Sequence, residues 1–274
     1  MISRRRRPSA GKPLYKRRNW VPDKRDWNWE SDIRKKYPEV HEFVASCDGE
    51  KIAVPVKTDE GTFTACVNGE LWEGRFEKLW YTRFGPDMRL TALVMNDDRW
   101  TVSVDDKEWE EKFEYVWNTR FSEDGSRIGV QVKKDFKYSV AVDGKPWENS
   151  YVSIREFELS RDGETVAVLA QLEALKEADI FGFLEGTWGV VVDDKPWDEK
   201  FLNTWGLLLS DHGKHAAAQV RLDQVVYGMV VDNKVWPETF GHVWEPAFRP
   251  GTDSLCTKTR VRARRYTASG REET

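Results

Sequence analysis

One tryptophan recurs along this sequence at intervals close to 38 residues, and each copy closes a similar heptapeptide. The five heptapeptides are CVNGELW, SVDDKEW, AVDGKPW, VVDDKPW and VVDNKVW, and they end at Trp72, Trp109, Trp147, Trp197 and Trp236. The intervals between these residues are 37, 38, 50 and 39. A fixed period of this length is the signature of a repeat architecture, in which each unit buries its apolar face against its neighbours. The chain is therefore expected to form one array of repeats.

Two further aromatic positions follow the same period and, with the first, account for 11 of the 14 tryptophans. The position eight residues after each repeat tryptophan is occupied by Trp80, Trp117, Arg155, Trp205 and Trp244. The position nine residues before it is occupied by Phe63, Trp100, Tyr138, Trp188 and Tyr227. The five tryptophans that close the heptapeptides are interpreted as structural. Each is expected to fill the wedge between neighbouring repeats and to bury about 150–250 Å².

Each repeat divides into four short strands joined by turn residues. In the third repeat the strands are expected at 115–122, 127–133, 137–142 and 145–151. Their alternating or wholly apolar patterns fit the two-residue period of a strand. Pairs such as Asn68-Gly69 and Asp143-Gly144 tolerate the positive φ angles that tight hairpins require. Four antiparallel strands in about 40 residues predict a β-propeller blade.

The blade count follows from the repeats. Five complete blades are expected between about residue 40 and residue 240, and a sixth begins at Val243 but lacks a tryptophan-containing strand of its own. The sequence RDWNWE at Arg25–Glu30 resembles the missing strand, so residues 27–32 are expected to complete the last blade, because an open edge exposes unpaired backbone groups. The predicted fold over residues 26–274 is an all-β propeller of WD-repeat or TolB-like type, with six four-stranded blades closed by an N-terminal strand.

The 50-residue interval contains an insertion at about 172–186, with the sequence LEALKEADIFGFLEG. It is expected to extend the hairpin between the second and third strands of the fourth blade, with one or two helical turns at 172–178. Its exposed apolar candidates for contact with a partner are Ile180, Phe181, Phe183 and Leu184. The alternative is that the insertion folds back on its own blade.

The sequence offers no recognisable site for catalysis, a cofactor or a metal. It contains no HExxH, P-loop or GxSxG motif, and its three cysteines are far apart. His212 and His215 follow Asp211 within one turn, which permits a metal site, although a polar turn is the simpler interpretation. Acidic residues at repeat positions, such as Asp143, are interpreted as turn residues because a ring of equivalent sites cannot all be catalytic. No catalytic, cofactor-binding or metal-binding residue is therefore predicted.

Charge separates the first 25 residues from the rest of the chain. Residues 1–25 carry ten Lys or Arg and one Asp, which gives a net charge of +9 and leaves −13 on the remainder. This segment lacks the apolar core of a secretory signal, and no apolar run in the chain is long enough to span a membrane. We expect an extended or disordered arm that contacts anionic lipid or a protein partner, and not nucleic acid, which the acidic remainder repels. The candidate binding residues in the arm are Arg4, Arg5, Arg6, Arg7, Lys12, Tyr15, Lys16, Arg17, Arg18 and Trp20.

The tryptophan-rich repeats, the V-D-[DG]-K-P-W turns, the basic N-terminus and the absence of a cofactor motif together define a resemblance. Over residues 40–245 the chain resembles the tryptophan-rich cytoplasmic subunit of the Tmc complex, a transmembrane redox complex of sulfate-reducing bacteria. That subunit has no redox centre, and its neighbours are a membrane cytochrome b, a cytoplasmic iron–sulfur subunit and a periplasmic multihaem cytochrome c. The resemblance supplies no catalytic residue that could be matched to this sequence.

Three functions are compatible with these features. The first, implied by the resemblance, is a non-catalytic accessory or scaffolding subunit of a membrane-bound electron-transfer complex in sulfate respiration. Such a subunit would need no cofactor and would lie in the cytoplasm, peripherally associated with the inner face of the membrane. The second is a free-standing WD-like adaptor for a soluble protein. The third is a propeller enzyme with its site at the central channel, which predicts polar residues that break the repeat and converge there.

Overall fold

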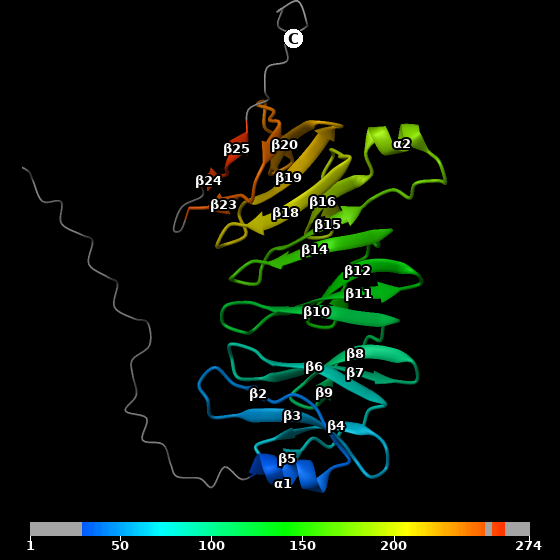
Figure 1. Ribbon diagram of the computed structural model, residues 1–274, viewed down its shortest axis with the longest axis vertical. Coiled ribbons are helices and arrows are strands. Elements are labelled where there is room, and N and C mark those ends of the chain that lie inside the picture. Colours follow the sequence, from blue (N-terminus) through cyan, green and yellow to red (C-terminus); the bar gives the residue numbers. More distant parts are fainter. Residues whose placement is uncertain (1–28, 250–253, 261–274) are drawn as a thin grey trace, which may run out of the picture.

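The computed structural model describes residues 29–249 and 254–260, which fold into antiparallel sheets that follow one another along the chain (Figure 1). Four consecutive sheets each have four strands in sequence order. The second sheet consists of β6 (Lys78–Phe84), β7 (Leu90–Asn96), β8 (Arg99–Val104) and β9 (Lys107–Glu108). The third consists of β10 (Tyr115–Phe121), β11 (Ile128–Lys134), β12 (Lys137–Val142) and β13 (Lys145–Pro146).

The fourth sheet consists of β14 (Ser153–Leu159), β15 (Val166–Gln171), β16 (Trp188–Val192) and β17 (Lys195–Pro196). The fifth consists of β18 (Asn203–Leu209), β19 (Ala216–Asp223), β20 (Val226–Val231) and β21 (Lys234–Val235). Each sheet corresponds to one sequence repeat and has the strand order of a propeller blade. The all-β, propeller-type fold predicted from the repeats is therefore confirmed.

The first sheet has the same order, but its first strand is interrupted. It consists of β1 (Glu39–Val40), β2 (Val44–Ala45), β3 (Ile52–Lys57), β4 (Phe63–Val67) and β5 (Glu70–Leu71). Both β1 and β2 pair with β3, on the same edge of the sheet. Together they take the place that a single strand has in the other blades.

The sixth blade is present as two short strand pairs. β22 (His242–Val243) pairs with β25 (Thr259–Arg260), and β23 (Ala247–Phe248) pairs with β24 (Leu255–Cys256). The blade begins where the repeat predicted it. Its strands are only two residues long. The sequence on either side of the Pro250-Gly251 turn signal contains only short apolar runs, which do not support longer strands.

The predicted N-terminal closing strand is wrong for residues 29–32, which belong to helix α1 (Trp29–Lys36). Ile33 of this helix is buried against Val54 and Val56 of β3 in the first sheet. Arg34, Lys35 and Lys36 lie in the last helical turn, where positive charge is favourable. The local likeness to a tryptophan-containing strand is thus outweighed by helix packing, and residues 27 and 28 lie outside the described residues.

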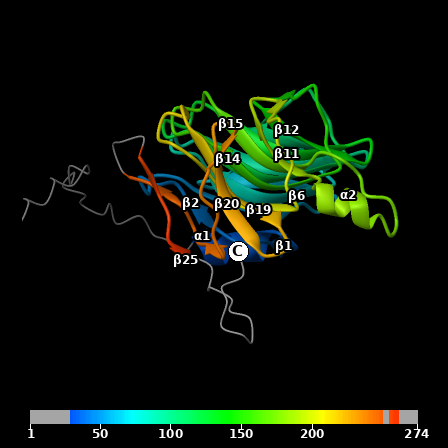
Figure 2. The same ribbon diagram turned by 90° about the horizontal axis from the view of Figure 1, so that it is seen from above.

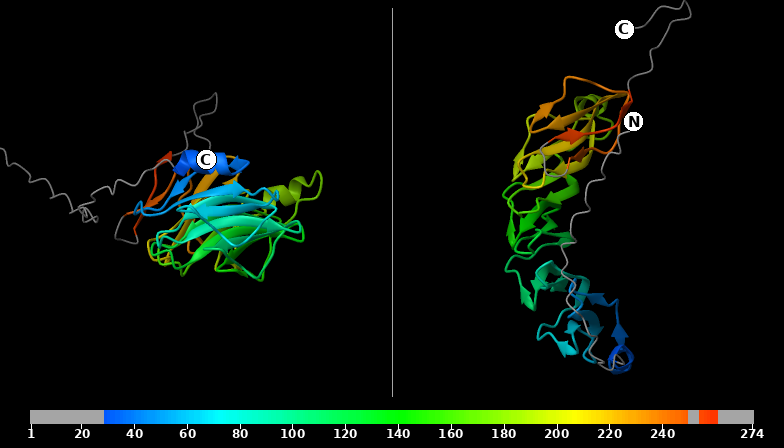
Figure 3. Two further views of the ribbon diagram at one scale, coloured as in Figure 1. Left: turned by 90° about the horizontal axis from the view of Figure 1, so that it is seen from below. Right: turned by 90° about the vertical axis from the view of Figure 1, so that its left-hand side faces the viewer.

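The sheets lie along a curve and do not form a closed ring (Figure 3). The first sheet is at one end of the molecule and the incomplete last sheet at the other (Figure 1), and the view from above shows the intervening sheets fanned behind one another (Figure 2). β14 contacts β10 and β18, the first strands of the sheets on either side. The first strands therefore line the inside of the curve, and within the described residues the predicted ring closure is not formed.

Apolar clusters fill the spaces between neighbouring sheets. In one of them Trp72 of the first repeat packs with Leu79 and Leu90 of the second sheet. Trp72 is buried, and the other four heptapeptide tryptophans are half-buried against the equivalent clusters. These tryptophans therefore lie between sheets, in the place that the wedge interpretation gives them.

A fourth periodic position also lies in the core. Four residues after each heptapeptide tryptophan the chain carries Phe76, Phe113, Tyr151, Phe201 and Phe240. Each forms an isolated β-bridge to the start of the third strand of its own sheet. Phe113 is completely buried between the second and third sheets. The sequence analysis did not single out this position, although it follows the same period.

The insertion lies between β15 and β16, so the prediction that it extends this hairpin is confirmed. The helical turns expected at 172–178 are wrong, because the helix is α2 (Ile180–Glu185). Its start is fixed by Asp179, whose carboxylate accepts a hydrogen bond from the Gly182 amide at 2.8 Å. Its end is fixed by Gly186, which has a φ of 86°.

Candidate functional site

The two ends of each sheet differ in chemistry. One end holds the starts of the first strands and the connections between second and third strands, and we call it the aromatic end. The other end holds the connections between first and second strands and between third and fourth strands, and we call it the turn end. Because the strands alternate in direction, all blades present the same type of connection at the same end.

Aromatic pairs recur at the aromatic end of successive sheets. In each pair, a residue near the start of the first strand contacts a residue near the start of the third strand. The pairs and their ring-centroid separations are Trp80–Trp100 at 5.1 Å, Trp117–Tyr138 at 5.9 Å and Trp205–Tyr227 at 5.9 Å. These are the two periodic positions found in the sequence, so the period places one aromatic pair in each of these blades, stacked in the second sheet and edge-to-face in the third and fifth.

Two further rings join neighbouring pairs. Tyr115 lies between the second and third sheets, with its ring 5.7 Å from Trp100 and 5.8 Å from Trp117. His242 does the same near the last sheet, at 5.5 Å from Tyr227 and 4.6 Å from Trp244. We call the whole set the aromatic row: Trp80, Trp100, Tyr115, Trp117, Tyr138, Arg155, Trp188, Trp205, Tyr227, His242 and Trp244.

The aromatic end carries the exposed large apolar side chains of the described ranges. They lie at or beside the start of a first strand, no further along it than the bulge, or in a connection between second and third strands. They are Trp80, Tyr81, Tyr115, Phe136, Val152, Leu175, Ile180, Phe181, Phe183, Leu184, Val225 and Trp244. Trp80 is 45% exposed and Trp244 is 44% exposed although each contacts other rings. An apolar surface gathered on one face is typical of interaction sites.

Two open depressions flank Tyr115 within this surface. One lies between Tyr115 and Trp80, and its floor includes Leu93. The other lies between Tyr115 and Tyr138, and its rim carries Glu114 and Lys133. Aromatic walls with a few polar groups at the rim are suited to anchor side chains of a docked partner.

Arg155 stands where the repeat otherwise carries an aromatic residue. Its guanidinium carbon lies 3.7 Å from the ring centroid of Trp188, so a cation–π contact replaces the aromatic pair in the fourth sheet. Its Nη1 atom donates a hydrogen bond to Asn203 at 2.6 Å. The row thus continues through the fourth sheet, with a positive charge at its centre.

The predicted partner-binding residues of the insertion also lie at the aromatic end. None of the α2 residues is buried, and Phe181 is 81% exposed. A six-residue helix with no buried face has little stability of its own in water. The apolar side chains of α2 are therefore not buried by the blade that carries the insertion.

At the turn end, polar side chains form hydrogen bonds with other groups of the same chain. Asp106 has a φ of 68° in the turn between β8 and β9, and its carboxylate accepts hydrogen bonds from the amides of Glu73 at 2.6 Å and Gly74 at 3.1 Å. Asp194 makes the equivalent contacts to Glu148 and Asn149. Since donor and acceptor belong to neighbouring repeats, these turns link one blade to the next.

A second set of repeat acids caps strands within a blade. In each case one carboxylate oxygen accepts a hydrogen bond from the first residue of the second strand, at 2.8 to 2.9 Å. The capping residues are Asp105, Asp143, Asp193 and Asp232. All four have positive φ angles. The interpretation of the repeat acids as turn residues is therefore confirmed.

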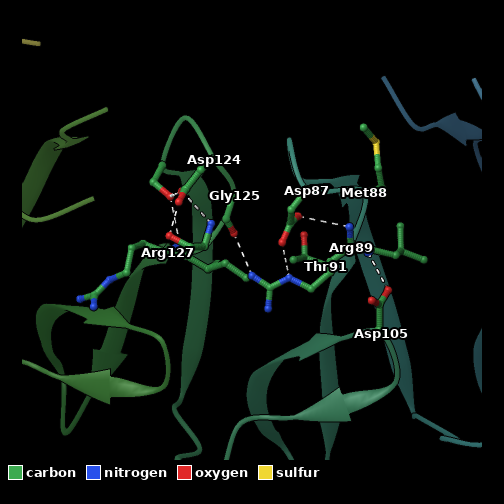
Figure 4. Close-up of polar contacts among 12 residues, drawn as sticks. Asp87, Met88, Arg89, Thr91, Asp105, Asp124, Gly125 and Arg127 are labelled. Carbon is green, nitrogen blue, oxygen red and sulfur yellow. Dashed lines mark hydrogen bonds and ion pairs between the residues drawn. The ribbon is translucent and has the colours of Figure 1, made fainter. Parts of the chain in front are cut away.

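The connections between first and second strands add a third network (Figure 4). Asp124 accepts hydrogen bonds from the Ser122 hydroxyl at 2.6 Å and from the Ser126 amide and hydroxyl, which lowers its pKa from 3.8 to about 2. Arg89 contacts Asp87 in its own sheet and donates to the Gly125 carbonyl of the next sheet at 2.8 Å. The side chains of Asp124 and Arg89 are therefore engaged in hydrogen bonds within the chain.

The histidine turn belongs to this polar end. His215 lies 2.5 Å from Asp232, and His212 lies 3.8 Å from Asp162. Within residues 29–249 and 254–260, no group of three or more His, Cys, Asp or Glu side chains is placed to hold a metal ion. Neither α1 nor α2, the helices of that part of the chain, is long and apolar enough to cross a membrane. The predicted arm residues from Arg4 to Trp20 lie outside the described residues.

Polar residues that break the repeat do occur on the inside of the curve, on β14. Glu156 accepts hydrogen bonds from the amides of Gly206 at 3.0 Å and Leu207 at 2.7 Å, at the bulge in β18. Glu158 lies 3.5 Å from Arg120, and burial raises the pKa of Glu158. These acids connect neighbouring first strands. The sequence analysis did not identify them, although the departure from the repeat is visible at these positions.

Comparisons with known proteins concern the fold. No family model and no curated protein matches the chain. Among solved structures, TolB from Acinetobacter baumannii is 13% identical with a TM-score of 0.34, over 70% of this chain and 51% of that chain. The tricorn protease is 14% identical with a TM-score of 0.43, over 70% of this chain and 21% of that chain. The β-propeller domain of the Trilobed protease from Pyrococcus furiosus is 13% identical with a TM-score of 0.41, over 84% and 85% of the two chains.

Proposed function

We propose that this protein is a non-catalytic interaction module that docks on its partner through the aromatic end. The observation that carries this proposal is the gathering of the exposed large apolar side chains at that one end. The turn end offers a different surface, because its carboxylates are engaged in hydrogen bonds within the chain. Aromatic side chains are enriched among the residues that dominate binding energy at protein interfaces.

The resemblance to the Tmc subunit indicates the assembly to which we propose that this protein belongs. The protein would be an accessory or scaffolding subunit of a membrane-bound electron-transfer complex, on its cytoplasmic face, beside cytochrome b and iron–sulfur subunits. The aromatic end would bind a protein subunit, and the basic segment at residues 4–18 would contact anionic lipid or the same complex. The large exposed apolar surface supports an obligate partner, since such a surface favours association in water.

Purification of the tagged protein from the organism that encodes it tests this proposal. We expect the wild-type chain to co-purify with haem and iron–sulfur absorbance. A Trp80→Ser/Trp244→Ser variant should lose these partners while staying folded, because both side chains are about half exposed and their truncation lowers the melting temperature by only a few degrees. Arg161→Gln at the turn end is the matched control and should retain them.

Two outcomes would contradict the docking proposal, and a third would contradict the proposed assembly. Purification of an isolated monomer that turns over a substrate would favour a propeller enzyme. Retention of all partners by the double tryptophan variant would remove the aromatic end as the docking surface. Co-purification with a soluble protein that carries no redox centre would favour the free-standing adaptor, which would use the same surface.

The basic segment has its own test. Changing Arg4, Arg5, Arg6 and Arg7 together to Glu should release the protein from membranes without altering its melting temperature. Wild-type retention should also fall with salt, because the Debye length shrinks from about 10 Å at 0.1 M to about 3 Å at 1 M. Full retention of the quadruple variant at moderate salt would make the segment a passive tail.

A further inference from the structure

Arg155 is the one place where a cation replaces an aromatic residue in its periodic position between the second and the last blade. The equivalent position holds Trp80, Trp117, Trp205 and Trp244. Arg155 also lies in the fourth of the six repeats, near the middle of the aromatic row. A departure from the repeat at its centre needs a reason other than the packing that the repeat already provides.

The Arg155 side chain is held in one position by its neighbours. Its guanidinium lies against the Trp188 ring at 3.7 Å, and Nη1 donates to the Asn203 side chain at 2.6 Å. The backbone is fixed as well, because the buried Gln131 side chain donates to the Arg155 carbonyl at 3.1 Å. A planar guanidinium held in this way keeps its remaining N–H groups ready for a bidentate acceptor.

The acids closest to Arg155 in the sequence are engaged elsewhere. Both oxygens of Glu156 accept backbone amides of β18, and Glu158 pairs with Arg120. Within the described part of the chain, Arg155 forms no ion pair with Asp or Glu, and it is exposed. Its positive charge is therefore available to an anion from outside the chain.

We infer that Arg155 binds a carboxylate of the docked partner, from an Asp or Glu side chain that is flanked by apolar residues. This inference rests on the proposed docking function and names the chemistry of the segment that docks. The carboxylate matches the fork of the guanidinium, and its apolar neighbours match the rings of Trp188, Trp117 and Trp205 on either side. Exclusion of water by these rings strengthens the ion pair.

Binding of a defined peptide to the full chain tests the inference. The probe is acetyl-Thr-Phe-Asp-Phe-Thr-amide, and the matched control peptide has Asn in place of Asp. Binding is followed by NMR through the Arg155 Nε–H and Trp188 indole N–H signals. We expect the Asp peptide to bind about tenfold more tightly, because a charge-assisted hydrogen bond is about twice as strong as a neutral one.

The Arg155→Trp variant restores the residue that the repeat carries and therefore keeps the apolar surface. It should bind both peptides equally, with the affinity that the wild type shows for the Asn peptide. Arg155→Lys keeps the charge without the planar fork and should lose most of the preference for Asp. Arg161→Gln, at the turn end, should behave as the wild type.

The outcomes separate this inference from the proposed function. Equal binding of both peptides at the aromatic row would overturn the carboxylate inference and leave the docking surface intact. A failure of both peptides to shift these signals would overturn it too, and loss of native partners in the Trp80→Ser/Trp244→Ser variant would still support docking. Inorganic phosphate is the third probe, and a response to phosphate as strong as to the Asp peptide would make Arg155 a general anion site and overturn the inference.

Discussion

The two ends of the sheets are built from the same repeat, but their side chains make different contacts. At the turn end, acids such as Asp106 and Asp124 accept backbone and hydroxyl hydrogen bonds from their own and neighbouring repeats. At the aromatic end, Trp80, Tyr115 and Trp244 contact other rings and still present apolar surface to solvent. One end therefore completes the fold, while the other carries surface that the fold does not need.

This difference shows how a repeat protein can divide its periodic positions between stability and binding. The heptapeptide tryptophans and the buried phenylalanines four residues later pack between sheets. The two other aromatic positions contact one another at the aromatic end, stacked in the second sheet and edge-to-face in the third and fifth. Both sets look alike in composition, but they differ in burial, since Phe113 is completely buried and Trp80 is 45% exposed.

The largest contrast should appear between Phe113→Ala and Trp80→Ala. Phe113 is completely buried, so its truncation should lower the free energy of unfolding by about 3–5 kcal/mol. Trp80 is 45% exposed, and its truncation should lower it by about 1 kcal/mol. Urea unfolding measures both, and equal losses would mean that the aromatic row stabilises the fold as much as the core does.

A smaller contrast should separate Asp106→Ala from Asp98→Ala. Both residues lie in tight turns with positive φ angles, 68° and 57°, so alanine introduces similar backbone strain in both. Asp106 also accepts two amides of the preceding repeat, and their loss should cost about 1–2 kcal/mol more at the turn end. Equal destabilisation by the two variants would show that the link between repeats contributes nothing.

The smallest effect concerns acid. The folded-state pKa of Asp124 is about 2, below its ordinary value of 3.8, because Ser122 and Ser126 donate to its carboxylate. Its contribution to stability is therefore present above about pH 4 and is lost as the pH falls through 2. In that window the Ser126 amide should lose protection from hydrogen exchange at the turn end, before the Trp80–Trp100 stack changes. Ser122→Ala should raise the pKa of Asp124, and an unchanged NMR titration would contradict this assignment.

The sequence period was sufficient to predict the blades, their strand order and the role of the repeat acids. It was insufficient at the N-terminus, where the RDWNWE stretch resembles a repeat strand but Ile33 packs a helix on the first sheet. Local likeness over six residues cannot decide between a strand at one end of the array and a helix at the other. The choice depends on tertiary packing and on the curvature of the array, which small rotations between blades determine.

The aromatic row was visible in the sequence as a period, but its exposure was not. Trp80 and Trp100 stack on each other, yet Trp100 is buried and Trp80 is 45% exposed. Periodicity alone predicts that an apolar residue is buried. Its exposure can be inferred only once the strand is known to lie on the inside of the curve. Arg155 did carry a signal, because it replaces an aromatic residue in an otherwise regular position.

The central claim is that the aromatic end is covered by a partner in the native assembly. Hydroxyl-radical footprinting of the native assembly and of the isolated chain tests it most directly, with the oxidation of Trp80, Tyr115 and Trp244 compared with that of His212 at the turn end. We expect the three aromatic residues to be protected in the assembly and His212, whose side chain is 75% exposed, to react equally in both samples. Protection of His212 with unchanged oxidation of Trp80, Tyr115 and Trp244 would contradict the account.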